Sequence, residues 1–171
     1  MAWSETTTTG GPRAMAAFRL TSPAFEHDAE LPLRYTGEGD DLSPPLNWAG
    51  TPPGTKELAL VCDDPDAETG VFTHWVVYGL APDVTGLPEA IPGDAIIESE
   101  EVSLVQGLNE FDEVGWSGPV ASDERGPHRL FFRLFALDTE LLDLPPGVSR
   151  AELRTAAKDH IIEQALLVGI V

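Results

Sequence analysis

Two short apolar segments joined by an acidic turn decide the fold of this chain, and they occupy residues 57–78, ELALVCDDPDAETGVFTHWVVY. The first is an apolar run that ends at Cys62, and the second, residues 72–78, is rich in β-branched and aromatic side chains. Both compositions are typical of strands. The turn at residues 63–66 sets three aspartates around a proline, a combination that ends a strand. We therefore predict two strands joined by an acidic turn.

More strands are expected on either side of this stretch. Residues 129–137 form a longer apolar and aromatic run, and residues 31–35 alternate as an edge strand would. Proline and glycine clusters separate these segments. Short strands at such spacing predict a mostly β protein, a sandwich rather than repeated βαβ units. Residues 84–112 are rich in proline and acid, and we expect them to form a long, largely irregular excursion across one face.

One helix is expected near the C-terminus. Ser149 and Glu152 fit a capping box, in which each side chain binds the backbone N–H of the other residue. The positions that follow at helical spacing form a mainly apolar stripe: Leu153, Ala157, His160, Ile161 and Gln164. We expect this stripe to pack against a sheet, with His160 in a core or hydrogen-bonding role. The apolar residues at the end of the chain predict a last strand.

The length of the chain, 171 residues, predicts one domain. Residues 1–15 carry threonine and glycine runs without any core pattern, so we expect a disordered N-terminal tail followed by a single domain over residues 16–171. A domain of this size buries enough surface to fold without a disulfide or a metal. The single cysteine, Cys62, lies in an apolar run and is expected to be a buried structural thiol.

The charge of the chain excludes several classes of function. Ten Lys and Arg against 29 Asp and Glu leave a net charge of −19. Nucleic acids and anionic membrane surfaces are recognised by basic side chains, so we expect neither as a partner. No apolar run approaches the roughly 18 residues of a membrane span, and the N-terminus lacks a secretory signal pattern. We therefore expect no membrane insertion and a cytoplasmic location.

The acidity itself has two interpretations. It serves solubility, or it adapts the protein to high salt, where ions screen the repulsion between carboxylates. Only Lys56 and Lys158 are lysines, and this shortage favours the halophilic interpretation.

The candidate functional residues are the aspartates of the turn and two histidines. Asp64 follows the first strand, His74 lies within the second, and His128 begins a third. If these strands are neighbours, the imidazoles and carboxylates meet at one end of a sheet. Taken singly, each is equally well explained as part of a solvated turn or as an interior histidine with a structural hydrogen bond. Arg129 should point to the face opposite His128 and form a structural ion pair.

Such a cluster is compatible with three kinds of chemistry. Histidine and aspartate are ligands for a divalent metal, and a His–Asp pair can act as a general acid or base. Imidazoles oriented by a carboxylate can also hold an anionic group together with backbone amides. The sequence contains no spacing motif for zinc, no phosphate-binding loop and no nucleophile elbow. The residues alone therefore leave the three open, and no cofactor is expected.

Short motifs along residues 18–171 resemble, in their order, the phosphatidylethanolamine-binding protein family, in its bacterial and archaeal Raf-kinase-inhibitor-like branch. They include Ser43-Pro44-Pro45-Leu46, Asp63-Asp64-Pro65-Asp66-Ala67, His74-Trp75-Val76, Gly118-Pro119 and His128-Arg129. The pair Gly118-Pro119 is weak by itself. The acidic turn and the two histidine motifs, in this order, are together specific.

The resemblance implies an antiparallel β-sandwich, with a large sheet, a smaller sheet and a helix near the C-terminus. It also implies a small pocket at one end of the sheet that receives phosphorylated groups, including phospholipid head groups, or carboxylates. Carried over position by position, the pocket residues are Asp64, Asp66, His74, Gly118, Pro119 and His128. Where the family has pocket tyrosines, this chain has Leu130 and Trp116.

We therefore predict a small cytosolic protein that binds a phosphorylated or carboxylate anion. The resemblance also suggests that it modulates or inhibits a kinase or protease partner, which the pocket motifs do not identify. The alternative is a hydrolase or lyase that uses a His–Asp pair in the same pocket, although no residue stands out as a nucleophile. A divalent-metal-binding protein is the third interpretation, and a homodimer is left open.

Overall fold

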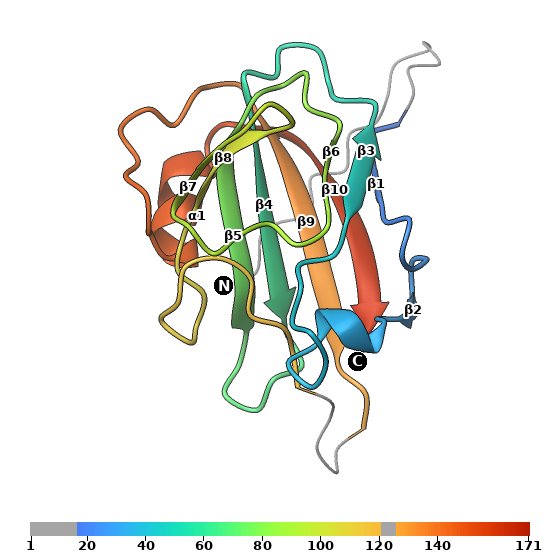
Figure 1. Ribbon diagram of the computed structural model, residues 1–171. Coiled ribbons are helices and arrows are strands. Elements are labelled where there is room, and N and C mark those ends of the chain that lie inside the picture. The colour runs from blue at the N-terminus through green and yellow to red at the C-terminus, as the bar shows by residue number, and fades with distance from the viewer. Residues whose placement is uncertain (1–16, 121–125) are drawn as a thin grey trace.

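The structure is a computed structural model that describes residues 17–120 and 126–171. The tail expected over residues 1–15 lies outside these residues. Within them, two sheets face each other and one α-helix covers the far side of the larger sheet (Figure 1). No helix in this part of the chain is long and apolar enough to cross a membrane.

The large sheet has seven strands among the described residues. Their order across the sheet is β2 (Ala29–Glu30), β10 (Ile161–Ile170), β9 (Arg129–Leu137), β4 (Glu57–Asp64), β5 (Phe72–Leu80), β8 (Ser103–Gln106) and β7 (Ile96–Glu98). The small sheet consists of β1 (Arg19–Thr21), β3 (Leu46–Ala49) and β6 (Gly86–Leu87). All pairs are antiparallel except β2 with β10. The predicted mostly β sandwich is confirmed.

Hydrophobic cores form on both faces of the large sheet. On the face that meets the small sheet, Trp75, Phe132 and Leu134 pack with Trp48 and other buried residues. On the other face, Leu153 and Ala157 of the helix α1 (Arg150–Ala157) pack against the sheet. Strands β4, β5 and β9 are therefore buried on both sides, which explains why their sequences are nearly continuous apolar runs.

The helix begins as predicted but ends earlier. The capping box at Ser149 and Glu152 is present, and α1 ends at Ala157. The expected stripe was wrong beyond this point, because Ile161 and Gln164 belong to the ten-residue strand β10, where both pair with residues of β9. Sheet pairing outweighs helical spacing here. His160 is not in the core: its side chain is 44% exposed, and its Nδ1 lies 2.8 Å from Asp138 Oδ1.

Two other expectations need correction. Residues 31–35 do not form an edge strand; Leu33–Tyr35 form a 3-10 turn, η1, and Tyr35 is buried. Pro32 has no N–H to donate to a sheet, and its carbonyl accepts instead from Tyr35 N, at 3.0 Å. The stretch at residues 84–112 is irregular in large part, but it also holds the short strands β6, β7 and β8.

A β-bulge in β5 places the second candidate histidine. Cys62 pairs with Trp75, and the next residue of β4, Asp63, pairs with Thr73, so His74 is the extra residue. In a regular strand of the same sequence, Thr73 and Trp75 are two residues apart and would point to the same face. With the bulge, Trp75 lies in the core under the small sheet, while Thr73 binds Asp63 on the helix side. Bulges redirect side chains in this way at the ends of sheets.

Candidate anion-binding site

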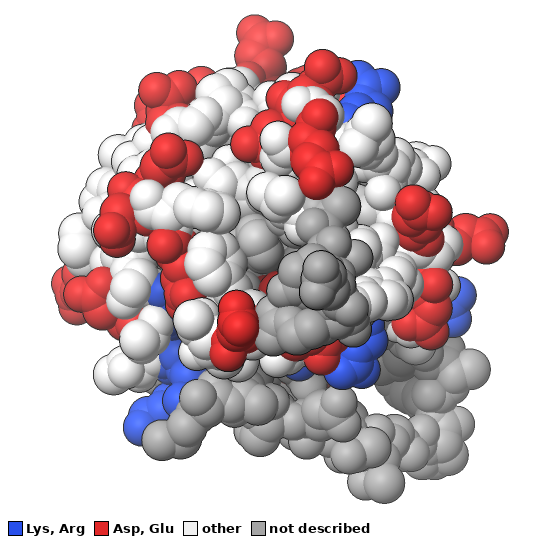
Figure 2. Space-filling model, turned by 90° about the horizontal axis from the view of Figure 1, so that it is seen from below, with Lys and Arg blue, Asp and Glu red and all other residues white. Residues whose placement is uncertain are grey.

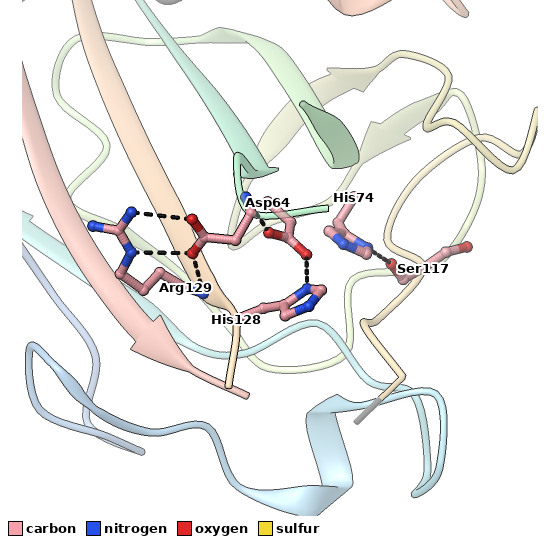
Figure 3. Close-up of polar contacts among 6 residues, drawn as sticks. Asp64, His74, Ser117, His128 and Arg129 are labelled. Carbon is pink, nitrogen blue, oxygen red and sulfur yellow. Dashed lines mark hydrogen bonds and ion pairs between the residues drawn. The ribbon is translucent and has the colours of Figure 1, made fainter. Parts of the chain in front are cut away.

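Three strand ends meet at one end of the large sheet. Strand β4 ends at Asp64, and its antiparallel neighbours β5 and β9 begin there, at Phe72 and Arg129. Asp64, His74 and His128 thereby come together from the ends of three neighbouring strands (Figure 3). The juxtaposition expected if the strands are neighbours is present.

Asp64 orients the ring of His128. Asp64 Oδ2 lies 2.7 Å from His128 Nδ1, and Asp64 Oδ1 accepts a 2.8 Å hydrogen bond from the backbone N–H of Asp66. The side chains of His128 and Asp64 are only 17% and 7% exposed. The carboxylate requires a proton on Nδ1, which leaves Nε2 for another partner. Nε2 is buried and has no hydrogen-bond partner among the described residues.

His74 lies beside this pair and is held from the opposite side. Its Nδ1 donates to the carbonyl of Ser117, at 2.7 Å, so Nε2 is an acceptor in the neutral ring (Figure 3). Burial lowers the pKa of His74 below its ordinary value, and the Ser117 carbonyl and the charges of Asp64 and Asp41 offset this only in part. The ring is therefore neutral near pH 7, and it can donate from Nε2 only after it takes up a proton.

Gly118 and Pro119 directly follow Ser117, whose carbonyl holds His74. Gly118 N donates to Asp41 Oδ1 at 2.6 Å, and the Pro119 carbonyl accepts from Gly37 N at 2.9 Å. A Cβ at Gly118 would lie 2.5 Å from the Tyr35 carbonyl oxygen, so only glycine permits this approach. The two residues thus fasten the segment after η1 to the segment that holds His74.

Asp41 is a residue that sequence reasoning missed. Its carboxylate binds the Gly118 amide, and its charge acts on His74. It lies 77 residues before Gly118 in the sequence, in an acidic loop that resembles other acidic loops of this chain. No local signal separates it from them.

Asp66 takes part in a different way from the other predicted residues. Its carboxylate accepts from Arg129 N and Nε at 3.0 Å and from Arg129 Nη2 at 3.1 Å. The Arg129 guanidinium lowers the pKa of Asp66. The side chain of Asp66 therefore fastens the start of β9, and its backbone N–H holds Asp64. The ion pair of Arg129 agrees with the expectation from strand alternation.

Aromatic rings line the His74 side of the site. Phe72 and Phe111 lie with their ring centroids 5.0 Å and 6.4 Å from that of His74, and Trp116 lies at 6.4 Å. Phe111 is half exposed. Leu130, at the other position without a tyrosine, is fully buried in the core. Apart from Trp116, this aromatic lining was not foreseen from the sequence.

The arrangement offers an oriented His–Asp pair, a second histidine and an aromatic wall. In the described ranges, no group of three or more His, Cys, Asp or Glu side chains is placed to hold a metal ion. Cys62 is buried, as expected, and burial raises the pKa of its thiol. The His–Asp pair and the second histidine equip this end of the sheet for hydrogen bonding through imidazole.

A comparison with protein families decides the affiliation. The family model for the phosphatidylethanolamine-binding protein matches residues 21–171. The chain belongs to this family. The match includes both sheets apart from the first residues of β1, and it includes all six predicted site residues.

Relatives in the family come from distant microorganisms. A UPF0098 protein of Methanothermobacter thermautotrophicus is 44% identical over 151 residues, which cover 88% of this chain and 96% of the relative. A UPF0098 protein of Aquifex aeolicus is 41% identical over 156 residues, which cover 91% of this chain and 88% of the relative. Their names state no activity.

Solved structures of family members have the same fold. The homologue CT736 of Chlamydia trachomatis is 36% identical, with a TM-score of 0.79 over 91% of this chain and 97% of that one. YbcL of Escherichia coli, described as a new member of the mammalian family, is 29% identical. Its TM-score is 0.80 over 91% of this chain and 98% of that one.

Proposed function

We propose that this protein binds small phosphorylated or carboxylate anions between His74 and His128. The observation that carries the proposal is the His128 ring, which Asp64 holds at Nδ1 while Nε2 is buried without a partner among the described residues. A buried polar nitrogen without a partner is costly, and a ligand that binds it removes the cost. Membership in the phosphatidylethanolamine-binding protein family supports a ligand with a phosphoryl group.

The net charge opposes this ligand, so local chemistry has to overcome the field of the whole molecule. Asp and Glu side chains are scattered over this end of the molecule, and the few Lys and Arg lie at its margins (Figure 2). Salt screens the distant carboxylates beyond about 8 Å at physiological ionic strength. Within the site, a protonated imidazole donates a charge-assisted hydrogen bond, which is stronger than a neutral one. We therefore expect anion binding to be accompanied by proton uptake and to strengthen as the pH falls.

A second candidate function, hydrolysis or elimination, is favoured by the same Asp64–His128 geometry. An imidazole oriented at Nδ1 by a carboxylate is also the arrangement of a general base. Turnover of a phosphoester or carboxylic ester panel, lost in His128→Ala, would identify an enzyme. The proposal extends to the modulation or inhibition of a kinase or protease partner. This activity requires a surface that contacts the partner, in addition to the anion site.

The test is a two-dimensional NMR titration of the full chain with inorganic phosphate and with acetate, in molar KCl. Both anions should shift the ring resonances of His74 and His128. The variants His74→Ala and His128→Ala should abolish these shifts without loss of the fold. His160→Ala is the matched control, because His160 forms a similar 2.8 Å pair with Asp138 but is exposed. Ring resonances that do not move with either anion would contradict the proposal.

Asp64→Asn tests the role of the carboxylate. The variant removes a negative charge from the site, which by itself would favour an anion. If Asp64 acts by holding the His128 ring with Nε2 directed to the ligand, phosphate affinity should instead fall by about tenfold, the loss expected when one oriented hydrogen bond is weakened. Tighter phosphate binding in Asp64→Asn would mean that the carboxylate is only an electrostatic obstacle.

A further inference from the structure

The tryptophans of the described chain differ in how their indole N–H groups are satisfied. Trp48 Nε1 donates to the Val84 carbonyl at 2.6 Å, and Trp75 Nε1 donates to Gln106 Oε1 at 2.8 Å. Trp116 Nε1 is also buried but has no acceptor among the described residues. Indole N–H groups usually find a partner when they are buried, so Trp116 is the exception that requires an explanation.

The position of Trp116 can be derived from the sheet register. Its ring stacks on Phe132 of β9, at 6.0 Å, and meets Trp75 of β5 edge-on, at 5.7 Å. Phe132 and Trp75 are both register partners of Cys62, on the strand between them. Trp116 therefore lies across β4 above Cys62, two residues inward from Asp64 on the same face.

This position makes Trp116 the inner boundary of the candidate site. Its ring lies 6.4 Å from His74, and the next residue, Ser117, holds His74 through its carbonyl. Among the described residues, two buried ring nitrogens without partners, Trp116 Nε1 and His128 Nε2, thus belong to the same end of the sheet. One anion can satisfy both, because one of its oxygens can accept from the indole N–H and another can accept from His128 once Nε2 carries a proton.

We propose that the indole N–H of Trp116 is a second ligand donor of this site and binds an oxygen of the phosphorylated or carboxylate anion. This inference rests on the proposed function. The indole N–H keeps its proton at all ordinary pH values, whereas His74 donates from Nε2 only when its ring is protonated. Trp116 thereby supplies a part of anion binding that does not depend on pH, and His74 supplies a part that does.

The experiment follows the indole N–H resonances of the full chain, labelled with nitrogen-15, during titration with inorganic phosphate and separately with acetate. The Trp116 N–H proton should move downfield on saturation. Those of Trp48 and Trp75 should stay nearly unchanged, because their N–H groups already have acceptors. Trp116→Phe, which keeps an aromatic ring but removes the donor, should weaken phosphate binding by about tenfold. Trp48→Phe is the matched control and should leave affinity unchanged.

The pH dependence separates the two kinds of donor. Wild-type protein should retain residual phosphate binding at pH 8.5, and Trp116→Phe should lose it. If the histidine resonances respond to phosphate but the Trp116 N–H does not, and Trp116→Phe binds as well as wild type, this inference is overturned while the anion site stands. If neither histidines nor Trp116 respond, the proposed function itself fails. Should Trp116→Phe not fold, the wild-type N–H shift decides alone.

Discussion

Asp63 and Asp64 are consecutive residues of β4, and they show how the two faces of one sheet are used differently. On the helix face, Asp63 accepts from Thr73 Oγ1 at 2.9 Å and pairs with Arg150 Nε at 2.9 Å, with Arg133 Nη1 at 3.8 Å. Its side chain is 1% exposed. On the face toward the small sheet, Asp64 holds His128, whose second nitrogen has no partner among the described residues.

The difference lies in the partners rather than in the aspartates. Asp63 is surrounded by arginines, which keep their charge at all ordinary pH values, and both of its oxygens are bound. Its network is complete and joins the helix to the sheet. Asp64 is bound to an imidazole, which presents a second nitrogen to the site. The first arrangement is suited to stability, and the second is suited to a ligand.

The largest effect is expected when the Asp63 network is broken. Arg150→Leu leaves the buried Asp63 carboxylate with only Thr73 and the more distant Arg133. An uncompensated buried charge should lower the free energy of unfolding by about 3 kcal/mol, measured by urea denaturation. Lys158→Leu, at the exposed end of the helix, is the control and should cost less than about 0.5 kcal/mol. A loss under about 1 kcal/mol in Arg150→Leu would show that Arg133 alone compensates Asp63.

Salt should raise the melting temperature by screening repulsion at the surface, but it should change the contribution of the Asp63 network very little. With a net charge of −19, repulsion between exposed carboxylates is strong in dilute buffer and is screened in molar KCl. The melting temperature should rise by about 5 °C, which corresponds to roughly 2 kcal/mol for a domain of this size. Buried pairs are screened much less, so the deficit of Arg150→Leu should be nearly the same at both salt concentrations. A flat melting temperature would eliminate the halophilic interpretation.

A fall in pH should lower the stability of the protein but strengthen anion binding at the candidate site, and both effects involve His74. Burial lowers the pKa of His74 in the folded protein. Unfolding therefore takes up a proton, and this stability is lost as the pH falls below the unfolded pKa of about 6.5. The slope is at most about 1.4 kcal/mol per pH unit. Anion binding should strengthen over the same range, because the protonated ring donates from Nε2.

The histidine contribution is measured as the difference between wild type and His74→Gln. Glutamine can donate to the Ser117 carbonyl but does not titrate. Urea denaturation between pH 7.5 and 5.5 should show a smaller pH dependence in His74→Gln than in wild type. His160→Gln serves as the control, because that exposed ring lies outside the site. Equal slopes for His74→Gln and wild type would contradict the assignment of a neutral buried ring.

The smallest effect is expected for Asp66→Asn. Its pair with Arg129 is largely exposed, and exposed pairs contribute about 0 to 1 kcal/mol. The backbone N–H that holds Asp64 remains in the variant. Stability should fall by less than about 1 kcal/mol, and phosphate affinity should change less than twofold by NMR titration. A large loss of affinity would show that the Asp66 side chain contacts the ligand.

The central strands could be predicted from the sequence because burial on both faces makes them apolar throughout. The end of the helix could not, since Ile161 and Gln164 fit helical spacing and only pairing with β9 assigns them to a strand. The turn at Leu33–Tyr35 follows Pro32. Because proline has no N–H, it is tolerated both in an edge strand and in a turn, so the sequence does not separate these two structures.

The sequence predicted that Asp64, His74 and His128 would meet at one end of the sheet, but it did not predict the hydrogen-bond partner of each ring. His74 and His128 look alike in the sequence, yet one donates to a carbonyl and the other to a carboxylate. Which partner each ring meets depends on the bulge in β5 and on the path of the loop before Gly118. The surroundings of Trp116, whose N–H has no acceptor in residues 17–120 and 126–171, are formed by rings from separate segments, those of His74, Trp75 and Phe132. Neither feature has a local pattern.

The extra residue in β5 also determines what kinds of genetic change this end of the protein tolerates. Substitutions at residues 72–75 alter one side chain at a time. Loss of His74 would remove the extra residue of the bulge, so Thr73 and Trp75 would become neighbours on a regular strand and would keep their present partners, Asp63 and Cys62. Trp75 would stay in the core, and Thr73 would stay with Asp63. The sheet therefore tolerates the deletion of this one residue, whereas the candidate site would lose one of its two imidazoles.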